Sequence, residues 1–244
     1  MEKVKKITGY RLFLPLSCLL IVLLINLITT PTFFKISITN GVLYGYIIDV
    51  INRASELVVL AVGMTLVVSA SAGTDISVGA VMAVAAAVCT RVLAGGEVSV
   101  NEYANPYILA VLAALAVAVV CGGFNGFLVA KLKIQPMVAT LILFTAGRGI
   151  SQLVTNGQIT YIRVDSYKLL GNNIPGIPIP TPIFVAVIVV VLTYLLLKKT
   201  ALGMYIQAVG INERASRLVG LKSTKIIWLA YAFCGLCAGI AGLV

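Results

Sequence analysis

The sequence predicts an all-α fold, a polytopic transmembrane helical bundle, from three observations. The chain has 244 residues, of which 60% are hydrophobic and 11% charged, with a mean hydropathy of +1.08. Soluble domains have about 45–50% apolar and about 25% charged residues. The apolar residues also come in blocks about 17–25 long, the length that crosses a hydrocarbon core of roughly 30 Å. The gaps between the blocks are short, or are rich in proline and polar residues.

Seven apolar segments can be placed as spans. They cover residues 12–30, 56–72, 76–94, 107–130, 136–155, 182–197 and 226–244. The first has the basic flank of a signal peptide, but its apolar stretch is too long and no A-x-A-like cleavage site follows, so we expect an uncleaved span. The last ends in "CGLCAGIAGLV", whose small residues favour close helix packing. Because it stops at Val244 without a polar anchor, we expect a truncated chain whose C-terminal spans are missing.

The excess of positive charge indicates how the spans are oriented. Lys and Arg number 18 against 8 acidic residues, a formal charge of +10, which on a soluble protein would suggest nucleic acid. On a membrane protein the cytoplasmic loops carry such an excess, so we expect no nucleic-acid partner. The turn 131–135 and the loop 198–225 are therefore predicted to be cytoplasmic, and so is the N-terminus. Basic residues crowd that terminus: Lys3, Lys5, Lys6 and Arg11.

The number of spans tests this orientation. With the N-terminus inside, residues 31–55 lie outside, and three spans then bring the chain back inside at Lys131, as the charges require. The loop 156–181 falls outside and has turn-forming Gly, Asn and Pro rather than helical periodicity. The sixth span returns the chain to the cytoplasm, which places 198–225 there.

Metal and disulfide chemistry are not expected. The chain has five Cys and no His, and every Cys lies in an apolar run. Cys234 and Cys237 form a CxxC, but a structural zinc site needs four ligands and no second CxxC is present. We expect these two side chains to face a neighbouring helix as small apolar groups.

The long polar loop 198–225 contains the pattern of a short helix. Asn212 is a good N-cap, Glu213 lies in the first turn, where the positive helix end favours an acid, and Gly220 stands where a helix C-cap glycine belongs. The predicted helix, 213–219, is about 10 Å long at 1.5 Å per residue. A helix this short is marginal in water. The pattern alone leaves two readings open, a docking element for a partner and a capped surface connector without one.

The stretch "TALGMYIQAVGINERASRLVGLKSTKI" resembles the cytoplasmic loop of the sugar-importer permeases of the ribose/galactose/xylose type, the membrane subunits of bacterial ATP-binding cassette importers. The loop of that family is similar to T-x-x-G-x-x-x-x-A-V-G-x-N-x-x-A-A-x-x-x-G. The residues that match are Thr200, Gly203, Ala208, Val209, Gly210, Asn212, Ala215 and Gly220. Ser216 stands where the family has its second alanine. The resemblance implies a coupling helix, which sits in a groove of the ATPase subunit and transmits its closure.

Two further stretches carry the resemblance, which extends over almost the whole chain from Ile21. "GMTLVVSASAGTDISVGAVMA" is similar to G-M-T-x-V-x-x-x-G-G-I-D-L-S-V-G, with Ala72 in place of a glycine and Thr74 in place of an isoleucine, so the turn is expected to be stiffer here. "FNGFLVAKLKIQPMVATLILFTAGRGISQLVTNGQI" is similar to a segment with N-G-x-L-V, P-x-x-x-T-L and R-G. The likeness is closest to galactofuranose importer permeases.

The resemblance implies one permease domain over residues 1–244, with its coupling loop at 198–225. Members of the family have several spans beyond the position of Val244, which supports truncation. The coupling residues that it implies are Gly210, Asn212, Glu213, Arg214, Ala215, Arg217, Leu218 and Gly220.

Polar residues near or within the spans are candidates for a pore or a gate, because an ionisable residue inside a span costs roughly 2.5–3.5 kcal/mol and is usually paired or faces a cavity. Asp75, in "AGTDISVG", is either part of a lining turn at membrane depth, with Ser77 beside it, or the cap of the third span in a tight cytoplasmic hairpin. Asn125 and Gln135 are candidate path-lining residues, although an Asn in a span also joins helices.

Arg148 lies well inside the fifth segment, between two glycines in "TAGRGI". Its guanidinium has five donors to satisfy. The favoured reading is therefore a structural arginine bound by carbonyls or a carboxylate. The alternatives are a sugar contact and a side chain that reaches toward the outer interface.

Three classes of function compete. The chain has no G-x-x-x-x-G-K-[ST] motif, so a permease of this kind would contain no cofactor and would use ATP only through a partner subunit. The alternative is a self-contained channel or secondary transporter for a small polar solute, but no acidic ring or inverted repeat of broken helices is visible. An enzyme is disfavoured, because there is no His and no acidic pair at helical spacing in a span.

The resemblance implies the partners and the location. We expect an ATP-binding cassette ATPase, a periplasmic or extracellular sugar-binding protein, a second permease subunit (identical or not) and the lipid bilayer of a bacterial inner membrane. Aromatic residues make up only 8% of the chain, too few for a dense sugar-binding cage. This fits an importer whose monosaccharide, galactofuranose or a similar sugar, is held by the separate binding protein.

Overall fold

A computed structural model describes residues 13–39, 42–172, 174 and 177–244. Within these residues every predicted span is an α-helix, so the predicted all-α membrane bundle is confirmed. The basic residues of the N-terminus lie outside the described residues. The main helices are α2 (Phe13–Thr29), α3 (Tyr46–Ser71), α4 (Val78–Ala94), α5 (Tyr107–Ala130), α6 (Pro136–Val154), α8 (Thr181–Lys199), α9 (Ala201–Ile211), α10 (Glu213–Leu218) and α11 (Ser223–Leu243).

The lengths of these helices suit a membrane. Helices α3, α5, α6, α8 and α11 have 19–26 residues and are apolar enough to cross it. Helices α2 and α4 have 17 residues each, the lower end of the range of about 17–25 that spans a bilayer. The seven predicted segments are therefore seven apolar helices of spanning length or close to it.

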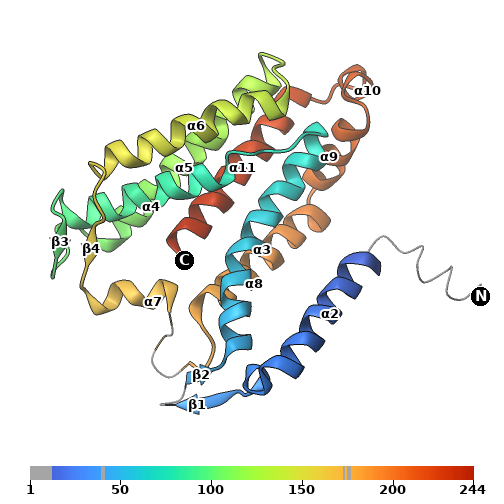
Figure 1. Cartoon of the computed structure of the whole chain (residues 1–244). Coiled ribbons are helices and arrows are strands. Elements are labelled where there is room, and N and C mark those ends of the chain that lie inside the picture. Colours follow the sequence, from blue (N-terminus) through green and yellow to red (C-terminus); the bar gives the residue numbers. More distant parts are fainter. Residues whose placement is uncertain (1–12, 40–41, 173, 175–176) are drawn as a thin grey trace, which may run out of the picture.

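Helices α3 and α11 form the centre of the bundle (Figure 1). On one side α11 packs against α5 and α4, with α6 beyond them, and on the other side α3 packs against α8 and α9. Helix α2 lies apart at the edge of the bundle and none of its described residues is buried. The α3–α11 core therefore positions the turns at either end of the molecule.

Small residues let α5 and α11 approach closely. A Cβ atom on Gly122 would overlap the carbonyl oxygen of Tyr231, and one on Gly235 would overlap that of Ala118. Gly239 faces Ala118 in the same seam. The close packing predicted from "CGLCAGIAGLV" is confirmed, because the backbones are too near for any side chain at these positions.

The CxxC residues face a neighbouring helix, as predicted. Cys234 and Cys237 are buried, and Gly63 of α3 lies against both, so that a Cβ atom on it would be 3.0 Å from the Cβ of Cys237. They act as small apolar groups at the α3–α11 contact.

The loops predicted to lie outside gather at one end of the molecule. There the chain forms η1 (Pro31–Phe34), the hairpin β1 (Ser37–Thr39) and β2 (Val42–Tyr44), a parallel pair β3 (Ser99–Val100) and β4 (Tyr161–Ile162), η2 (Asp165–Tyr167) and α7 (Lys168–Gly171). Hydrogen bonds join loops distant in sequence, such as Leu43 N–H to Pro178 O at 3.0 Å. The loop 156–181 has turns, as predicted, and also the short β4, η2 and α7 that the sequence did not reveal.

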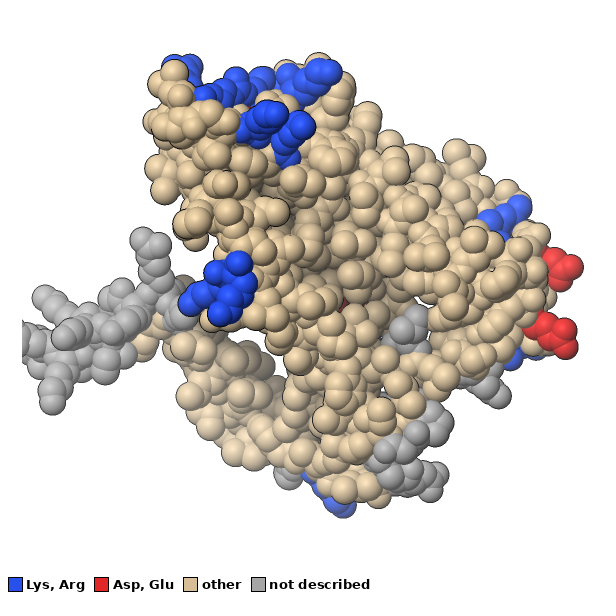
Figure 2. All heavy atoms as spheres, turned by 180° about the vertical axis from the view of Figure 1, so that it is seen from behind, with Lys and Arg blue, Asp and Glu red and all other residues tan. Residues whose placement is uncertain are grey.

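The turns predicted to lie inside gather at the opposite end. The 72–77 turn touches the start of α6, and α9 touches the end of α3. Helix α10 lies at this end, where Figure 2 shows Lys and Arg side chains gathered on the surface. The two groups of loops thus separate as the predicted crossings require.

Two helix boundaries differ from the prediction. Helix α3 begins at Tyr46 rather than at residue 56, because Asp49, Arg53 and Glu56 lower the hydropathy of its first turns without breaking the helix. Residues 201–211, predicted as part of a polar loop, form α9. Tertiary packing stabilises this short helix, since its Gly203, Ile206 and Val209 side is buried.

Candidate functional site

The short helix α10 forms as the sequence predicts. The Asn212 side chain accepts a hydrogen bond from the Ala215 N–H at 3.0 Å, which caps the helix N-terminus. At the other end Gly220 has φ +86, and the Leu221 N–H returns to the Ser216 carbonyl at 3.0 Å. This is the Schellman arrangement, and the left-handed residue in it is usually glycine. The predicted roles of Asn212 and Gly220 as caps are confirmed.

One side of α10 is anchored and the other is bare. Ser216 is buried, whereas Leu218 is 89% and Val219 78% exposed. Ile211, just before the helix, is 86% exposed. Arg214 and Arg217 lie on the same exposed turn. The element therefore presents three bare apolar side chains among cations, at the basic end of the molecule.

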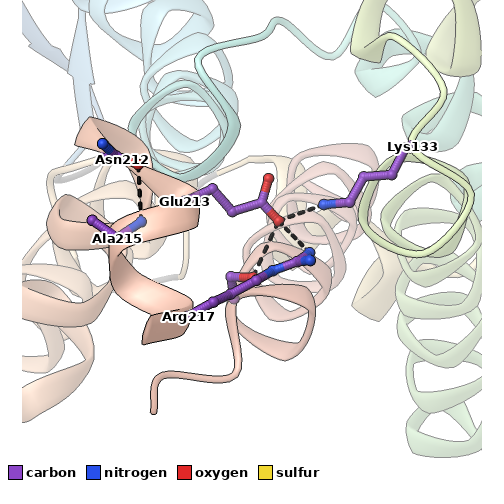
Figure 3. A network of polar contacts seen from close by, with 6 residues as sticks. Lys133, Asn212, Glu213, Ala215 and Arg217 are labelled. Atoms are coloured by element: carbon purple, nitrogen blue, oxygen red, sulfur yellow. Dashed lines mark hydrogen bonds and ion pairs between the residues drawn. The ribbon is translucent and has the colours of Figure 1, made fainter. Parts of the chain in front are cut away.

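Glu213 connects α10 to two other parts of the chain (Figure 3). Its Oε1 atom accepts hydrogen bonds from the Lys133 ammonium, from the Arg217 Nη2 atom at 2.7 Å and from the Ser223 hydroxyl at 3.1 Å. Arg217 Nε also donates to Ser223 Oγ at 2.7 Å. Partial burial tends to raise the pKa of Glu213, but the Lys133 ammonium, the Ser223 hydroxyl and the Arg217 guanidinium together hold that pKa below its ordinary value.

Close backbone contact fixes α9, which carries α10. A Cβ atom on Gly210 would overlap the carbonyl oxygen of Ser69 in α3, and one on Gly203 would overlap that of Leu197 in α8. Only glycine fits at these crossings. The predicted site residue Gly210 thus lies at the joint between α9 and α3 rather than on the exposed surface, and it fixes the position of α10.

The pore candidates Asp75, Ser77 and Asn125 form one buried polar cluster. Asp75 Oδ1 accepts from the Ser77 N–H at 2.8 Å and from the Ser77 hydroxyl at 2.6 Å. Asn125 Nδ2 donates to Ser77 Oγ at 2.8 Å. All three side chains are at most 2% exposed. The Asp75 carboxylate thus accepts from the N–H of Ser77, which is itself the N-cap residue of α4.

The 72–77 turn is partly covered by the bundle: Asp75 and Ser77 are buried, whereas Ala72, Thr74 and Ile76 are exposed. Ser71, at the end of α3, has its hydroxyl 3.3 Å from that of Tyr231, and Tyr231 is eight residues into α11, about 12 Å along the axis at 1.5 Å per residue. Irregular backbone at membrane depth is tolerated where protein buries it or where it lines a cavity. Asp75 is thus held within protein, and its two readings, a lining turn and a tight hairpin, stay predictions.

Gln135 and Arg148 are not part of this cluster. Gln135 is exposed at the start of α6 and lines a cavity of about 250 Å³ with Ser71, Lys133 and Glu213. Arg148 is exposed, and its guanidinium lies 4.4 Å from the ring centroid of Phe144, a cation–π contact. The favoured reading of Arg148, a structural arginine bound by carbonyls or a carboxylate, is wrong: Arg148 lies on an exposed face of α6 and stacks on Phe144 of the same helix.

The sequence missed three features of the site. In the sequence, Lys133 indicates only that its turn is cytoplasmic, and Ser223 matches no motif. Ile211 falls outside the predicted short helix. A Lys in a tight turn gives no pattern for a partner 80 residues away, so contacts of this kind come only from the fold.

Comparisons with known proteins identify the family. Residues 46–244 match the model of the family described as branched-chain amino acid transport system / permease component. The chain is 44% identical to the galactofuranose transporter permease protein YtfT of Escherichia coli K12, over 94% of this chain and 64% of that protein. It is 39% identical to the fructose import permease protein FruF of Bifidobacterium longum, over 98% and 66%.

A third relative, the ribose import permease protein RbsC of Escherichia coli K12, is 34% identical over 93% of this chain and 67% of its own length. The chain thus spans about two thirds of the length of the curated relatives that it matches. No solved structure matches it. The match over α3–α11 and the identities to these relatives show that the chain belongs to the branched-chain amino acid transport system / permease component family of membrane proteins.

Proposed function

We propose that the chain is the membrane-spanning permease subunit of an ATP-binding cassette importer, which moves a monosaccharide and is driven by a separate ATPase subunit. The named relatives, permeases for galactofuranose, fructose and ribose, support this function. In this proposal α10 is the coupling helix. The chain itself holds no cofactor and ATP is used by the partner subunit.

The observation that carries the proposal is the bare surface of α10. Apolar side chains exposed to water in a cluster, among charges, mark an interaction site. Ile211 before α10, Leu218 within it and Val219 after it are 78–89% exposed. Lipid does not explain it, because hydrocarbon does not accept the neighbouring Arg214 and Arg217 at low cost. A protein partner with an apolar groove and acidic rim fits this surface.

The further partners follow from the two ends of the molecule. With the N-terminus in the cytoplasm of a bacterial cell, the α10 end faces the ATPase and the end with β1–β4 and α7 faces a periplasmic or extracellular sugar-binding protein. A second permease subunit completes the path. In an alternating-access cycle the ATPase moves α10, and the buried Asp75 turn is a gate element at the inner end of the path.

The proposed substrate is galactofuranose or a similar monosaccharide. The support is the 44% identity to a galactofuranose transporter permease, which exceeds the 39% identity to a fructose permease and the 34% identity to a ribose permease. The exposed Gln135 and the half-buried Ser71 at the inner cavity supply hydrogen-bonding groups of the kind that a sugar needs at its exit.

Uptake into vesicles tests the proposal. The chain is reconstituted with its partner ATPase and sugar-binding protein, and uptake of labelled galactofuranose is measured with ATP and with a non-hydrolysable analogue. We expect uptake with ATP and none with the analogue. Unlabelled galactofuranose is expected to compete with the labelled sugar more strongly than fructose or ribose does. ATP-driven uptake of fructose or ribose instead would correct the substrate. Uptake that needs no ATP, or follows an ion gradient, would replace the importer by a channel or secondary transporter.

A further inference from the structure

We infer that Lys133 is a positioning residue through which α10 controls the first turn of α6 and the 72–77 turn behind it, in which Asp75 and Ser77 are buried. This role rests on the proposed function, because it requires a partner that moves α10. Lys133 belongs to the turn 131–135 between α5 and α6. Four observations carry the inference: a shared carboxylate oxygen, a strained backbone, a contact that continues inward, and free volume beside it.

The first observation is that three elements meet at one oxygen atom. Glu213 Oε1 of α10 accepts from Lys133 of the α5–α6 turn and from Ser223 at the start of α11. Arg217, one turn later in α10, binds the same oxygen. The N-terminus of α10 therefore cannot shift without either moving the α5–α6 turn or breaking the ion pair with Lys133 (Figure 3).

The second observation is the backbone of Lys133, which has φ +59. This left-handed conformation is unfavourable for every residue with a Cβ atom, and glycine adopts it freely. A glycine would make the same turn without strain but would have no ammonium to reach Glu213. Strain of this kind supports a function where the side chain also has a partner, and the partner of Lys133 is Glu213.

The third observation is that the contact continues from this turn into the bundle. Pro136 begins α6 three residues after Lys133, and its ring occupies the space that a side chain on Gly73 would need. The Thr140 hydroxyl, one turn later, accepts from the Ile76 N–H at 3.1 Å. The first turn of α6 thus holds the 72–77 turn at two points, on either side of Asp75.

The fourth observation is free volume beside the ion pair. The cavity of about 250 Å³ is lined by both Lys133 and Glu213, and by the start of α6 and the end of α3. Close-packed cores resist displacement. At this junction α10 and α6 can approach or separate without repacking a filled core, so the ion pair governs their relative position.

Three variants separate coupling from folding. Lys133→Gly removes the ammonium and relieves the backbone, so it does not fail for steric reasons. Lys133→Arg keeps a cation at the same place. Lys131→Ala is the charge control, because Lys131 lies in the same turn but over the ring of Phe127 rather than against Glu213.

The experiment measures sugar uptake and ATP hydrolysis together in vesicles that contain the chain, its ATPase and its binding protein. Binding of the ATPase is expected to stay within twofold of wild type in Lys133→Gly, since the exposed surface of α10 is untouched. Sugar moved per ATP is expected to fall about fivefold or more, the scale of a typical coupling between sites. Lys133→Arg and Lys131→Ala are expected to stay near the wild-type ratio.

A spin label at position 137 gives a second measurement independent of transport. Met137 is 53% exposed in the first turn of α6. ATP binding to the partner is expected to shift the label spectrum in wild type and Lys133→Arg, but not in Lys133→Gly. If the wild type shows ATP-driven uptake and Lys133→Gly has the same sugar-per-ATP ratio and the same label shift as the wild type, the role of Lys133 alone is overturned. A wild type without ATP-driven uptake would overturn the proposed function, and this role with it.

Discussion

Two turns at the same end of the bundle adopt the same strained backbone for different reasons. Ala72, after α3, has φ 51, and Lys133, after α5, has φ 59. The 72–77 turn is held from inside, by the buried carboxylate of Asp75. The 131–135 turn is held from outside, by the ion pair of Lys133 with Glu213. An unfavourable φ therefore indicates a functional side chain only where that side chain binds a partner.

The largest expected effect comes from a substitution that disrupts the 72–77 turn. Asp75→Ala leaves the Ser77 N–H and hydroxyl buried without an acceptor, and each such group costs roughly 1–3 kcal/mol. We expect a loss of about 3 kcal/mol in stability, visible as a lower melting temperature of the detergent-solubilised protein. Asp49→Ala is the control, because Asp49 is exposed and its loss is expected to cost at most about 1 kcal/mol. Equal melting temperatures for both variants would contradict the account.

Adding a methyl group tests the contact between the two turns. Gly73→Ala places a Cβ against the ring of Pro136, and such overpacking costs about 1–3 kcal/mol. Gly79→Ala is the matched control in α4, since nothing lies within 4 Å of its Cβ, and alanine there gains roughly 0.5–1 kcal/mol of helix propensity. The two substitutions should therefore shift the melting temperature in opposite directions. A shift of the same sign would show that the turns do not touch as described.

A smaller effect tests the backbone strain itself. Ala72→Gly relieves the left-handed conformation, which costs an alanine roughly 1–2 kcal/mol, although glycine also loses more entropy on folding. We expect a net gain in stability of about 1 kcal/mol, measured by chemical unfolding in mixed micelles. Asn156, φ 53 in an outer loop, offers a comparison, since Asn tolerates this region and should gain less from glycine. A loss of stability in Ala72→Gly would show that the turn is unstrained.

The smallest expected effect is the pH dependence of the outer ion pair. The folded pKa of Glu213 is lowered, so its contribution is complete above the unfolded pKa of about 4.5 and is lost as the pH falls through the lower folded pKa. Its side chain is 34% exposed, and screening keeps the contribution to about 1 kcal/mol or less. Melting temperatures of wild type and Glu213→Gln should differ slightly at pH 7 and converge as the pH falls through the folded pKa of Glu213. A difference that grows in acid would contradict the sign.

The sequence predicts the elements whose signals are local. Blocks of apolar residues locate the spans, and Asn212 and Gly220 locate the caps of α10, because each depends on residues within a few positions. The glycine-rich end of α11 predicts its close packing for the same reason. Even the departure at Ala72 from the glycine of the motif that this stretch resembles falls on a backbone that the structure shows to be left-handed.

The features that the sequence does not predict depend on distant contacts. Helix α9 is stable because α3 and α8 bury one side of it. The polar residues that flank it make the sequence pattern look like that of a loop. Arg148 was expected to be bound by carbonyls or a carboxylate, but whether such partners lie near a face of α6 depends on which helices pack there. The ion pair of Lys133 with Glu213 joins positions 80 residues apart, which no spacing rule connects.

The central claim is that the bare surface of α10 receives the ATPase. The most direct measurement is the affinity of the partner ATPase for the reconstituted chain, in wild type, Leu218→Asp and Leu218→Met. Leu218 is 89% exposed, so neither change disturbs the bundle. We predict binding weaker by about tenfold or more in Leu218→Asp, since charge in an apolar groove is costly, and unchanged in Leu218→Met. Equal affinity of the ATPase for all three would contradict the claim.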